Sequence, residues 1–433
     1  MSKTNYGSLA EAALTRRDKV LNEVLHRRLL SLSAESFDST LVEARMSTGI
    51  DQNVWARELD IVNRHITVDV ELVQEASAAY LELGNDLVDK LGWPKDAIQV
   101  LPQGSTSTRT LISSPTTEKF DIDAVCQVDL NRIEAQDPMA FFDKVGDALA
   151  EHDTEEMKRC WRINYNNKEF YIDFTPSIPL AIVPDIVKAS IRFKPTLRYN
   201  DTALAVVDRP TKGWKTSNPA GFANWINDQA QRRVLRQLQV TVEARDSANV
   251  TPVPEQHVPL SDTLRVAIRL FKRHRDMSVR RNLVSGEFKP ISVIISTLLT
   301  QAYEGLADLG KTYNHPIELL CDLAQMLPSM PQMAGTDYVI ANPTVEGENF
   351  AEKWNDDGGK RVLAFTLWSK LLIDDLTQIL NATDLADVRE KVHRAFGTTG
   401  ADRGPGGSGS PVGGLAAARP STVTPVRPTR GLA

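Results

Sequence analysis

The sequence has few cysteines, few aromatic residues and no long apolar run. Its three cysteines, Cys126, Cys160 and Cys321, stand far apart without CxxC or Cys/His spacing, which argues against a disulfide framework and a zinc site. We expect them to be small apolar core residues. No apolar run approaches the roughly 20 residues that cross a bilayer, and the first residues lack a secretory pattern. We therefore expect a cytoplasmic protein without a membrane segment.

Positive charge is also scarce for a protein that binds long nucleic acid. The 50 Lys and Arg residues are outnumbered by 56 Asp and Glu residues, giving a formal net charge of -6. Affinity for long DNA or RNA comes largely from clustered basic side chains that release counterions. Long nucleic acid is therefore not an expected partner, and any nucleotide ligand should be small.

The length of 433 residues favours two domains, and hydrophobic periodicity divides them by type. The first part is mixed: helices are predicted at 8–32, 54–92 and 137–150, a strand in AIQVLPQGS, another in FDIDAVCQVDL, and a hairpin from RCWRINYNN to KEFYIDFTPSI. The second part is predicted to be mostly helical, with helices at 222–246, 260–275, 290–308, 315–327 and 359–380. The fold class is therefore α+β, with domains expected at 1–205 and 206–396.

The last 37 residues, 397–433, differ sharply in composition from the rest. They hold nine of the chain's 24 glycines and five of its 23 prolines, and they show no apolar periodicity. Such a segment cannot bury enough apolar surface to offset the entropy of ordering. We predict a disordered tail.

Asp121 and Asp123 carry the strongest chemical signal. They stand two apart in an apolar strand, so both side chains point to the same face, and paired carboxylates of this kind suit a hard divalent cation. Taken alone, the pair is also compatible with a solvated strand edge. Asp173 lies in a second strand, FYIDFTP, where a third carboxylate would complete a two-metal site. Its alternative role is to cap the hairpin.

A small Gly-Ser loop precedes the paired aspartates. Gly104, Ser105 and Thr110 fall between a strand and a possible short helix, where backbone N–H groups and a hydroxyl can hold phosphates. Nucleotidyl transfer needs this combination, because a ribose hydroxyl attacks an α-phosphorus while pyrophosphate leaves, and two Mg²⁺ ions, or Mn²⁺, stabilise both oxygens. In this scheme Asp121 and Asp123 bridge the metals, and Asp173 binds the metal that activates the hydroxyl.

The order QGSTSTRTLI, FDIDAVCQVDL, EFYIDFTP resembles the nucleotidyltransferase superfamily that includes oligoadenylate synthases, cyclic GMP-AMP synthase and the bacterial CD-NTases of CBASS anti-phage systems. TKGWKTSNPAGFANWI, RLFKRHRD and NPTVEGENFAEKW extend the resemblance over about residues 60–380 and favour the bacterial, DncV-like branch. The resemblance implies a polymerase-β-like lobe, a helical C-terminal lobe and an active site in the cleft between them. It also implies synthesis of a cyclic di- or trinucleotide from NTPs, with ATP or GTP as substrates.

By the same resemblance, Lys272 and Ser292 should contact the triphosphate. A lysine and a helix N-terminus both attract anions, although Ser292 would serve equally as a simple helix N-cap. We expect the neighbouring Arg269, Arg273 and Arg275 to form a solvated basic face. Three tryptophans, Trp214, Trp225 and Trp354, are expected to pack in the core rather than stack on bases.

Other functions remain open on the sequence alone. The enzyme could modify a protein or small molecule with one nucleotide, or the chain could be an inactive nucleotide-binding scaffold. The resemblance further implies a separate effector that responds to the product. It also suggests a ubiquitin-conjugation-like partner that attaches the C-terminus, ending Arg430-Gly431-Leu432-Ala433, to a target.

Overall fold

The computed structural model describes residues 6–31, 52–115, 119–129, 137–183, 198–232, 234–235, 256–314 and 316–397. The predicted tail from 398 and the predicted helical stretch 236–246 lie outside these residues. Among them, no helix has the length and apolar character needed to cross a membrane. None of the three cysteines forms a disulfide, and Cys126 is buried while the other two are partly buried.

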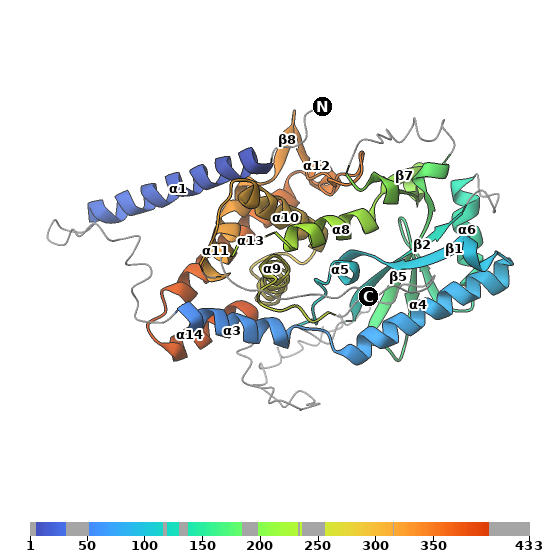
Figure 1. Cartoon of the computed structure of the whole chain (residues 1–433), viewed down its shortest axis with the longest axis horizontal. Helices are drawn as coiled ribbons and strands as arrows, with labels where there is room; N and C mark the ends of the chain where they lie inside the picture. Colours follow the sequence, from blue (N-terminus) through green and yellow to red (C-terminus); the bar gives the residue numbers. More distant parts are fainter. Residues whose placement is uncertain are drawn as a thin grey trace, which may run out of the picture.

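A mixed, seven-stranded sheet forms one half of the molecule (Figure 1). Its path runs β1-β2-β5-β4-β3, and β6 pairs with both β5 and β7. Only β2 and β5 are parallel neighbours; the other pairs are antiparallel. The strands are β1 Ile98–Pro102, β2 Phe120–Val128, β3 Asp153–Glu156, β4 Trp161–Asn164, β5 Phe170–Pro179, β6 Leu204–Asp208 and β7 Gly213–Ser217.

Two helices bury the sheet's apolar side chains. Val73, Ala76, Tyr80, Leu83 and Leu87 recur at helical spacing on the buried face of α4 (Val70–Leu91), and α6 (Pro138–Ala148) begins with an N-cap from Asp137. Together with the inner faces of the strands they form a continuous apolar core, which we call the sheet core. The predicted hairpin is confirmed as β4 and β5, and both predicted strands are present.

The other half is helical and has its own core, the helical core. It contains α8 to α14 and, against expectation, the N-terminal helices α1 (Tyr6–Ser31) and α3 (Gln52–His65). The elements are α8 Pro219–Ala230, α9 Thr263–Arg280, α10 Ser292–Asp308, α11 Pro316–Met326, α12 Glu352–Asp356, α13 Lys360–Leu380 and α14 Leu385–Phe396, with a small hairpin of β8 Gln332–Ala334 and β9 Asp337–Val339. The domain boundaries themselves stay a prediction.

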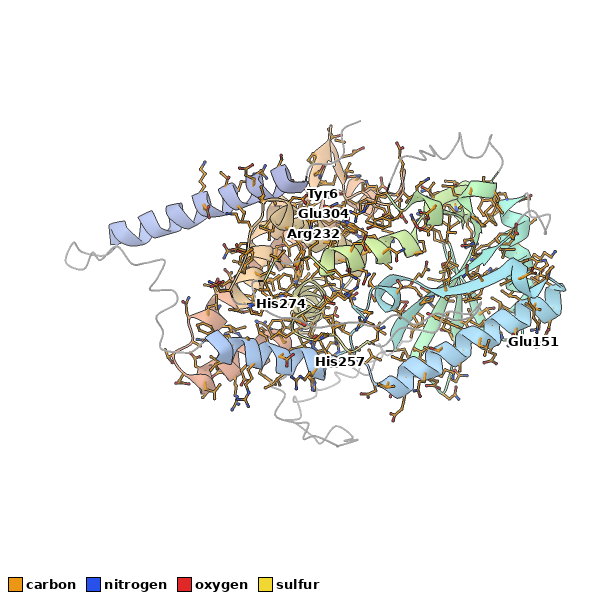
Figure 2. All side chains as sticks on the ribbon, in the orientation of Figure 1. Tyr6, Glu151, Arg232, His257, His274 and Glu304 are labelled. Atoms are coloured by element: carbon orange, nitrogen blue, oxygen red, sulfur yellow. The ribbon has the colours of Figure 1, made fainter. Side chains whose placement is uncertain are left out.

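The start of α1 packs closely against α10. A Cβ added to Gly305 would lie 2.2 Å from the carbonyl oxygen of Tyr6, so only glycine allows this approach. Figure 2 shows Tyr6, Glu304 and Arg232 near one another, where α1, α10 and the segment after α8 meet. The indole of Trp225 donates a hydrogen bond of 2.6 Å to Glu304. Trp214, Trp225 and Trp354 are all buried, which confirms their predicted core role.

The predicted basic face on α9 is wrong. Arg269, Arg273 and Arg275 are 0%, 4% and 7% exposed, because α9 runs through the middle of the helical half. Each guanidinium donates to backbone carbonyls of other segments: Arg269 to residues 63 and 256, Arg273 to residue 396, and Arg275 to residue 290. Buried arginines of this kind link separate segments by hydrogen bonds, since a guanidinium offers five donors in a fixed geometry.

Candidate active site

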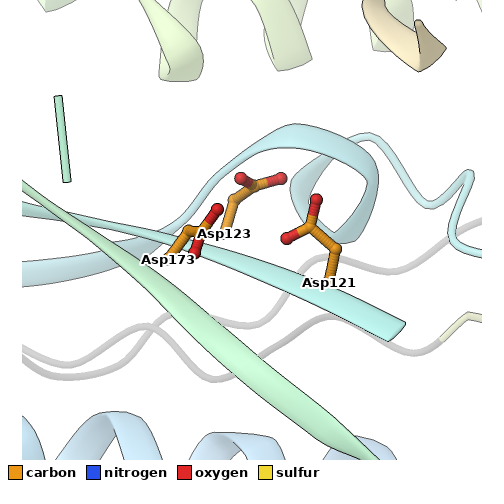
Figure 3. A group of neighbouring side chains, drawn as sticks. All are labelled: Asp121, Asp123 and Asp173. Carbon is orange, nitrogen blue, oxygen red and sulfur yellow. The ribbon is translucent and has the colours of Figure 1, made fainter. Parts of the chain in front are cut away.

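Asp121, Asp123 and Asp173 converge on one face of the sheet, near the starts of the interior strands β2 and β5 (Figure 3). In the parallel pair β2–β5, Asp123 lies directly opposite Asp173, while Asp121 projects from the same face two residues earlier. One carboxylate oxygen from each residue lies within 4.8 Å of the others. Among the described residues, this is the one group of three or more Asp, Glu, His or Cys side chains that lie close enough together to hold a metal ion.

The electrostatics of these carboxylates favour a bound cation. Desolvation of its carboxylate raises the pKa of Asp121 to about 6, with the charge of Asp173 adding to the effect. Burial, followed by the charge of Asp121, raises the pKa of Asp123 well above its usual range. Like charges held this close are costly unless a cation neutralises them. All three donors are carboxylate oxygens, so the site fits a hard divalent ion such as Mg²⁺.

Arg162, which no motif in the sequence indicates, provides positive charge beside these carboxylates. Arg162 on β4 lies opposite Asp173 and donates two hydrogen bonds to its carboxylate, at 2.8 and 2.9 Å. Its guanidinium also lies 4.1 Å from the ring centroid of Tyr171. A bidentate pair of this kind fixes the orientation of Asp173. The hairpin register could have indicated it, because the predicted turn places residues 162 and 173 opposite each other.

The Gly-Ser loop lies against the same carboxylates. Gly104 begins the one-turn helix α5 (Gly104–Ser107) and has a positive φ of 61°. A Cβ at this position would meet Asp123 Oδ2 at 2.1 Å, so the loop can approach the carboxylate only with glycine. The backbone N–H of Gln103 donates to the carbonyl of Asp123 at 2.9 Å, which fastens the loop to β2.

Lys272 joins the helical half to this loop. It is 3% exposed, and its Nζ donates to Ser105 Oγ at 2.9 Å and to the carbonyl of Thr110 at 2.7 Å. Burial, with the positive charge of Arg275 adding, lowers the pKa of Lys272 to about 7. The ammonium group therefore lies in a desolvated position, where its electrostatic attraction to a nearby phosphate would be stronger than in water.

A cavity of about 850 Å³ opens between the two halves over these residues. Six of the eight predicted site residues line it, together with aromatic and polar groups from both halves; Asp173 and Thr110 do not line it. The predicted lining residues are Gly104, Ser105, Asp121, Asp123, Lys272 and Ser292, with Ser292 at the first turn of α10.

Two predicted phosphate contacts need correction or refinement. Thr110 is fully buried and does not line the cavity; its hydroxyl lies 2.8 Å from that of Thr108, so the loop turns it inward. Ser292 is the first helical residue rather than the N-cap, which is Ile291, and its hydroxyl accepts a hydrogen bond from Arg275 at 3.1 Å. Ser292 therefore stays a candidate phosphate ligand, whereas buried Thr110 stabilises the Gly-Ser loop through its contact with Thr108.

Comparison with known proteins agrees with this geometry. A family model described as the nucleotidyltransferase domain of cyclic GMP-AMP synthase DncV-like proteins matches residues 98–176. A c-di-GMP synthase from Roseivirga ehrenbergii is 28% identical over 265 residues, which cover 60% of this chain and 62% of that relative. The match thus spans less than two thirds of the relative's length.

Two solved structures share the fold. The CD-NTase CdnG of Bradyrhizobium diazoefficiens, solved with GTP, superposes with a TM-score of 0.51 at 19% identity, covering 81% of this chain and 95% of that one. CdnC of E. coli MS115-1, solved with HORMA-deltaN, gives a TM-score of 0.52 at 12% identity, covering 81% and 98%. Residues 98–176, which carry all three aspartates, are therefore a DncV-like nucleotidyltransferase domain, set in a chain with the CD-NTase fold.

Proposed function

We propose that this protein joins NTPs, without a template, into a cyclic di- or trinucleotide and releases pyrophosphate at each step. The observation that carries the proposal is the convergence of Asp121, Asp123 and Asp173 beside a loop and a lysine suited to phosphates. All of these groups except Asp173 line one cavity between the two halves. The matched relative is named a c-di-GMP synthase, which supports cyclic products from guanine nucleotides.

In the proposed reaction, Asp121 and Asp123 would hold the divalent ions on the triphosphate side, and Asp173 would hold the ion on the acceptor side. Bound Mg²⁺ neutralises charge on the attacking and leaving oxygens. Ser105 and Lys272, next to these carboxylates, orient the phosphates of the donor nucleotide. The acceptor hydroxyl gives its proton towards Asp173, a new P–O bond forms at the α-phosphorus, and the bond to the β-phosphate breaks.

The direct test is to incubate the purified protein with four labelled NTPs and Mg²⁺ or Mn²⁺, digest with phosphatase and separate the products. A phosphatase-resistant small product is expected, because a cyclic oligonucleotide has no terminal phosphate. Label that appears only on protein or on a small-molecule acceptor would favour the alternative of single-nucleotide transfer, and no incorporation under any condition would favour an inactive scaffold.

An anti-phage role, a separate effector that responds to the product and conjugation of the C-terminus stay proposals that rest on the resemblance. The E. coli relative was solved with a HORMA protein, which is a precedent for a protein partner in that system alone. The tail lies outside the described residues. Deleting residues 398–433 is expected to leave NTP turnover unchanged in vitro, and loss of turnover would contradict a purely peripheral tail.

Lys272→Met should weaken NTP binding and remove its pH dependence between pH 7 and 9. In the folded protein without nucleotide, the pKa of Lys272 is lowered to about 7. Above that pH the side chain must take up a proton to bind a triphosphate, so NTP affinity should fall as pH rises. Losing a charge-assisted hydrogen bond of about 1.5–3 kcal/mol corresponds to roughly tenfold to a hundredfold in KM. Titration of NTP binding against pH for both proteins checks this. A pH profile identical in wild type and variant would exclude Lys272 as a phosphate ligand.

A further inference from the structure

Glu348 lies where two cavities meet. It lines the main cavity over the aspartates, and it also lines a second cavity of about 470 Å³. The two cavities share Lys289, Ile291, Glu348 and Phe350, so they are adjacent compartments. Among these shared residues Glu348 is the one whose side chain carries hydrogen-bond acceptors.

The carboxylate of Glu348 is held rigidly by two neutral donors. Ser217 Oγ donates to its Oε1 at 3.2 Å, and Asn342 Nδ2 donates to its Oε2 at 2.7 Å. The amide of Asn342 cannot turn over, because its oxygen accepts from both the backbone N–H and the hydroxyl of Thr344. Each carboxylate oxygen therefore has one of its two acceptor positions filled and one left.

Among the described residues, this carboxylate is acted on most strongly by the charge of Arg159, which offsets part of the effect of burial without forming an ion pair with it. Its two hydrogen-bond partners in the described structure are neutral, and burial raises the pKa of Glu348 above its usual value. A desolvated carboxylate with spare acceptor positions gains from further N–H donors, since hydrogen bonds to a charged group are stronger than those between neutral groups.

Aromatic side chains border the same cavity. Phe350 and Phe222 pack edge to face, with ring centroids 5.9 Å apart, and both line the main cavity. A planar base can stack on such a surface whatever its identity, so stacking supplies affinity but little selection. Selection must come from polar groups that read the edge of the base.

We propose that Glu348 selects guanine, by accepting two hydrogen bonds from the N1–H and the exocyclic N2 amine of the base. Guanine presents these two donors side by side. Adenine presents one donor beside the N1 acceptor, which repels a carboxylate, and the pyrimidines likewise present a donor next to an acceptor. The proposal rests on the proposed function, because it assigns the base of a nucleotide whose phosphates face Lys272 and the aspartates.

Glu348→Gln tests this assignment, because glutamine keeps the shape but replaces one acceptor oxygen with a donor. Equilibrium binding of GTP and of ATP, each with Mg²⁺, is measured on the whole protein before turnover. The variant should lose about tenfold to a hundredfold in GTP affinity, as expected for a charge-assisted hydrogen bond, while ATP affinity stays constant or rises. Glu352→Gln is the matched control: Glu352 lines the second cavity and pairs with Lys215 at 3.5 Å. It should leave the ratio of GTP to ATP affinity unchanged.

The outcomes separate the two proposals. If Glu348→Gln lowers affinity for GTP and ATP equally, Glu348 only stabilises the contacts with Ser217 and Asn342, and the assignment is wrong. A wild-type preference for ATP would also overturn it. If the wild-type protein binds neither nucleotide, the proposed function fails first. Thermal unfolding of each variant identifies any loss of fold, and Ser217→Ala provides a second variant, which weakens one supporting bond and should reduce GTP selectivity in the same direction.

Discussion

Changing Asp121 and Asp123 together to Asn is expected to reduce nucleotidyl transfer by about three orders of magnitude or more. The substitution keeps the shape of both side chains but removes the charge that would hold the divalent ions, whose stabilisation of the transition state amounts to several kcal/mol. The residual activity should not recover at high Mg²⁺, because the ligands themselves are gone.

The same double variant should be more stable than wild type at pH 7 when no metal is present. In the folded wild-type protein the pKa of Asp121 is raised to about 6 from an ordinary value of 3.8, and that of Asp123 is also raised. The folded state therefore binds more protons than the unfolded state, so stability is full below pH 3.8 and is lost as pH rises through about 6. The double variant has no charge at these two positions, so it should not lose stability in this pH range.

Thermal unfolding with and without Mg²⁺, at pH 5 and pH 7, measures both effects. Mg²⁺ should raise the unfolding temperature of the wild-type protein more at pH 7, where the carboxylates are ionised, than at pH 5. It should not change the unfolding temperature of the double variant at either pH. Asp143→Asn, an exposed change on α6, serves as a control for net charge and should behave as wild type. Activity of the double variant above a few per cent of wild type would exclude the two-metal assignment.

The convergence of these carboxylates could be predicted from the sequence because local rules position them. Strand alternation places Asp121 and Asp123 on one face, and the turn in the hairpin fixes the register of β4 and β5. The parallel pairing of β2 with β5 was not accessible in the same way, since it joins segments about 50 residues apart and depends on the sheet as a whole.

Long-range contacts explain the main differences from the predicted helices. The predicted helix at 54–92 is broken into α3 and α4 at residues 66–69. Arg269 on α9 donates to the carbonyl of Asn63 and, at 2.6 Å, to the hydroxyl of Thr67, so a distant side chain stabilises the end of α3. No local pattern around Thr67 reveals this partner. The same applies to Glu348, whose role depends on Ser217, 131 residues away.

The second large effect is expected at Gly104, where an added methyl group would clash with the Asp123 carboxylate. The Cβ of an alanine would lie 2.1 Å from Asp123 Oδ2, closer than real contacts allow. The loop cannot retreat easily, because the Gln103 N–H donates to the carbonyl of Asp123 and the Tyr80 hydroxyl donates to the same carbonyl at 2.8 Å. The backbone of β2 is thereby fixed, and the Asp123 side chain has to move.

Gly310→Ala separates this displacement from ordinary backbone strain. Gly310, directly after α10, has a φ of 65°, close to the 61° of Gly104, but an added Cβ there would meet no atom within 4 Å. Both variants should lose roughly 1–2 kcal/mol of stability, the cost of a left-handed conformation for an L-residue. Only Gly104→Ala should also lose turnover, by about a hundredfold, since a shift of about 1 Å in a catalytic group can cost that much. Mn²⁺ affinity, measured by titration, should fall with it. Wild-type turnover in Gly104→Ala, at a stability matching that of Gly310→Ala, would mean that the loop yields and that Asp123 is not held by it.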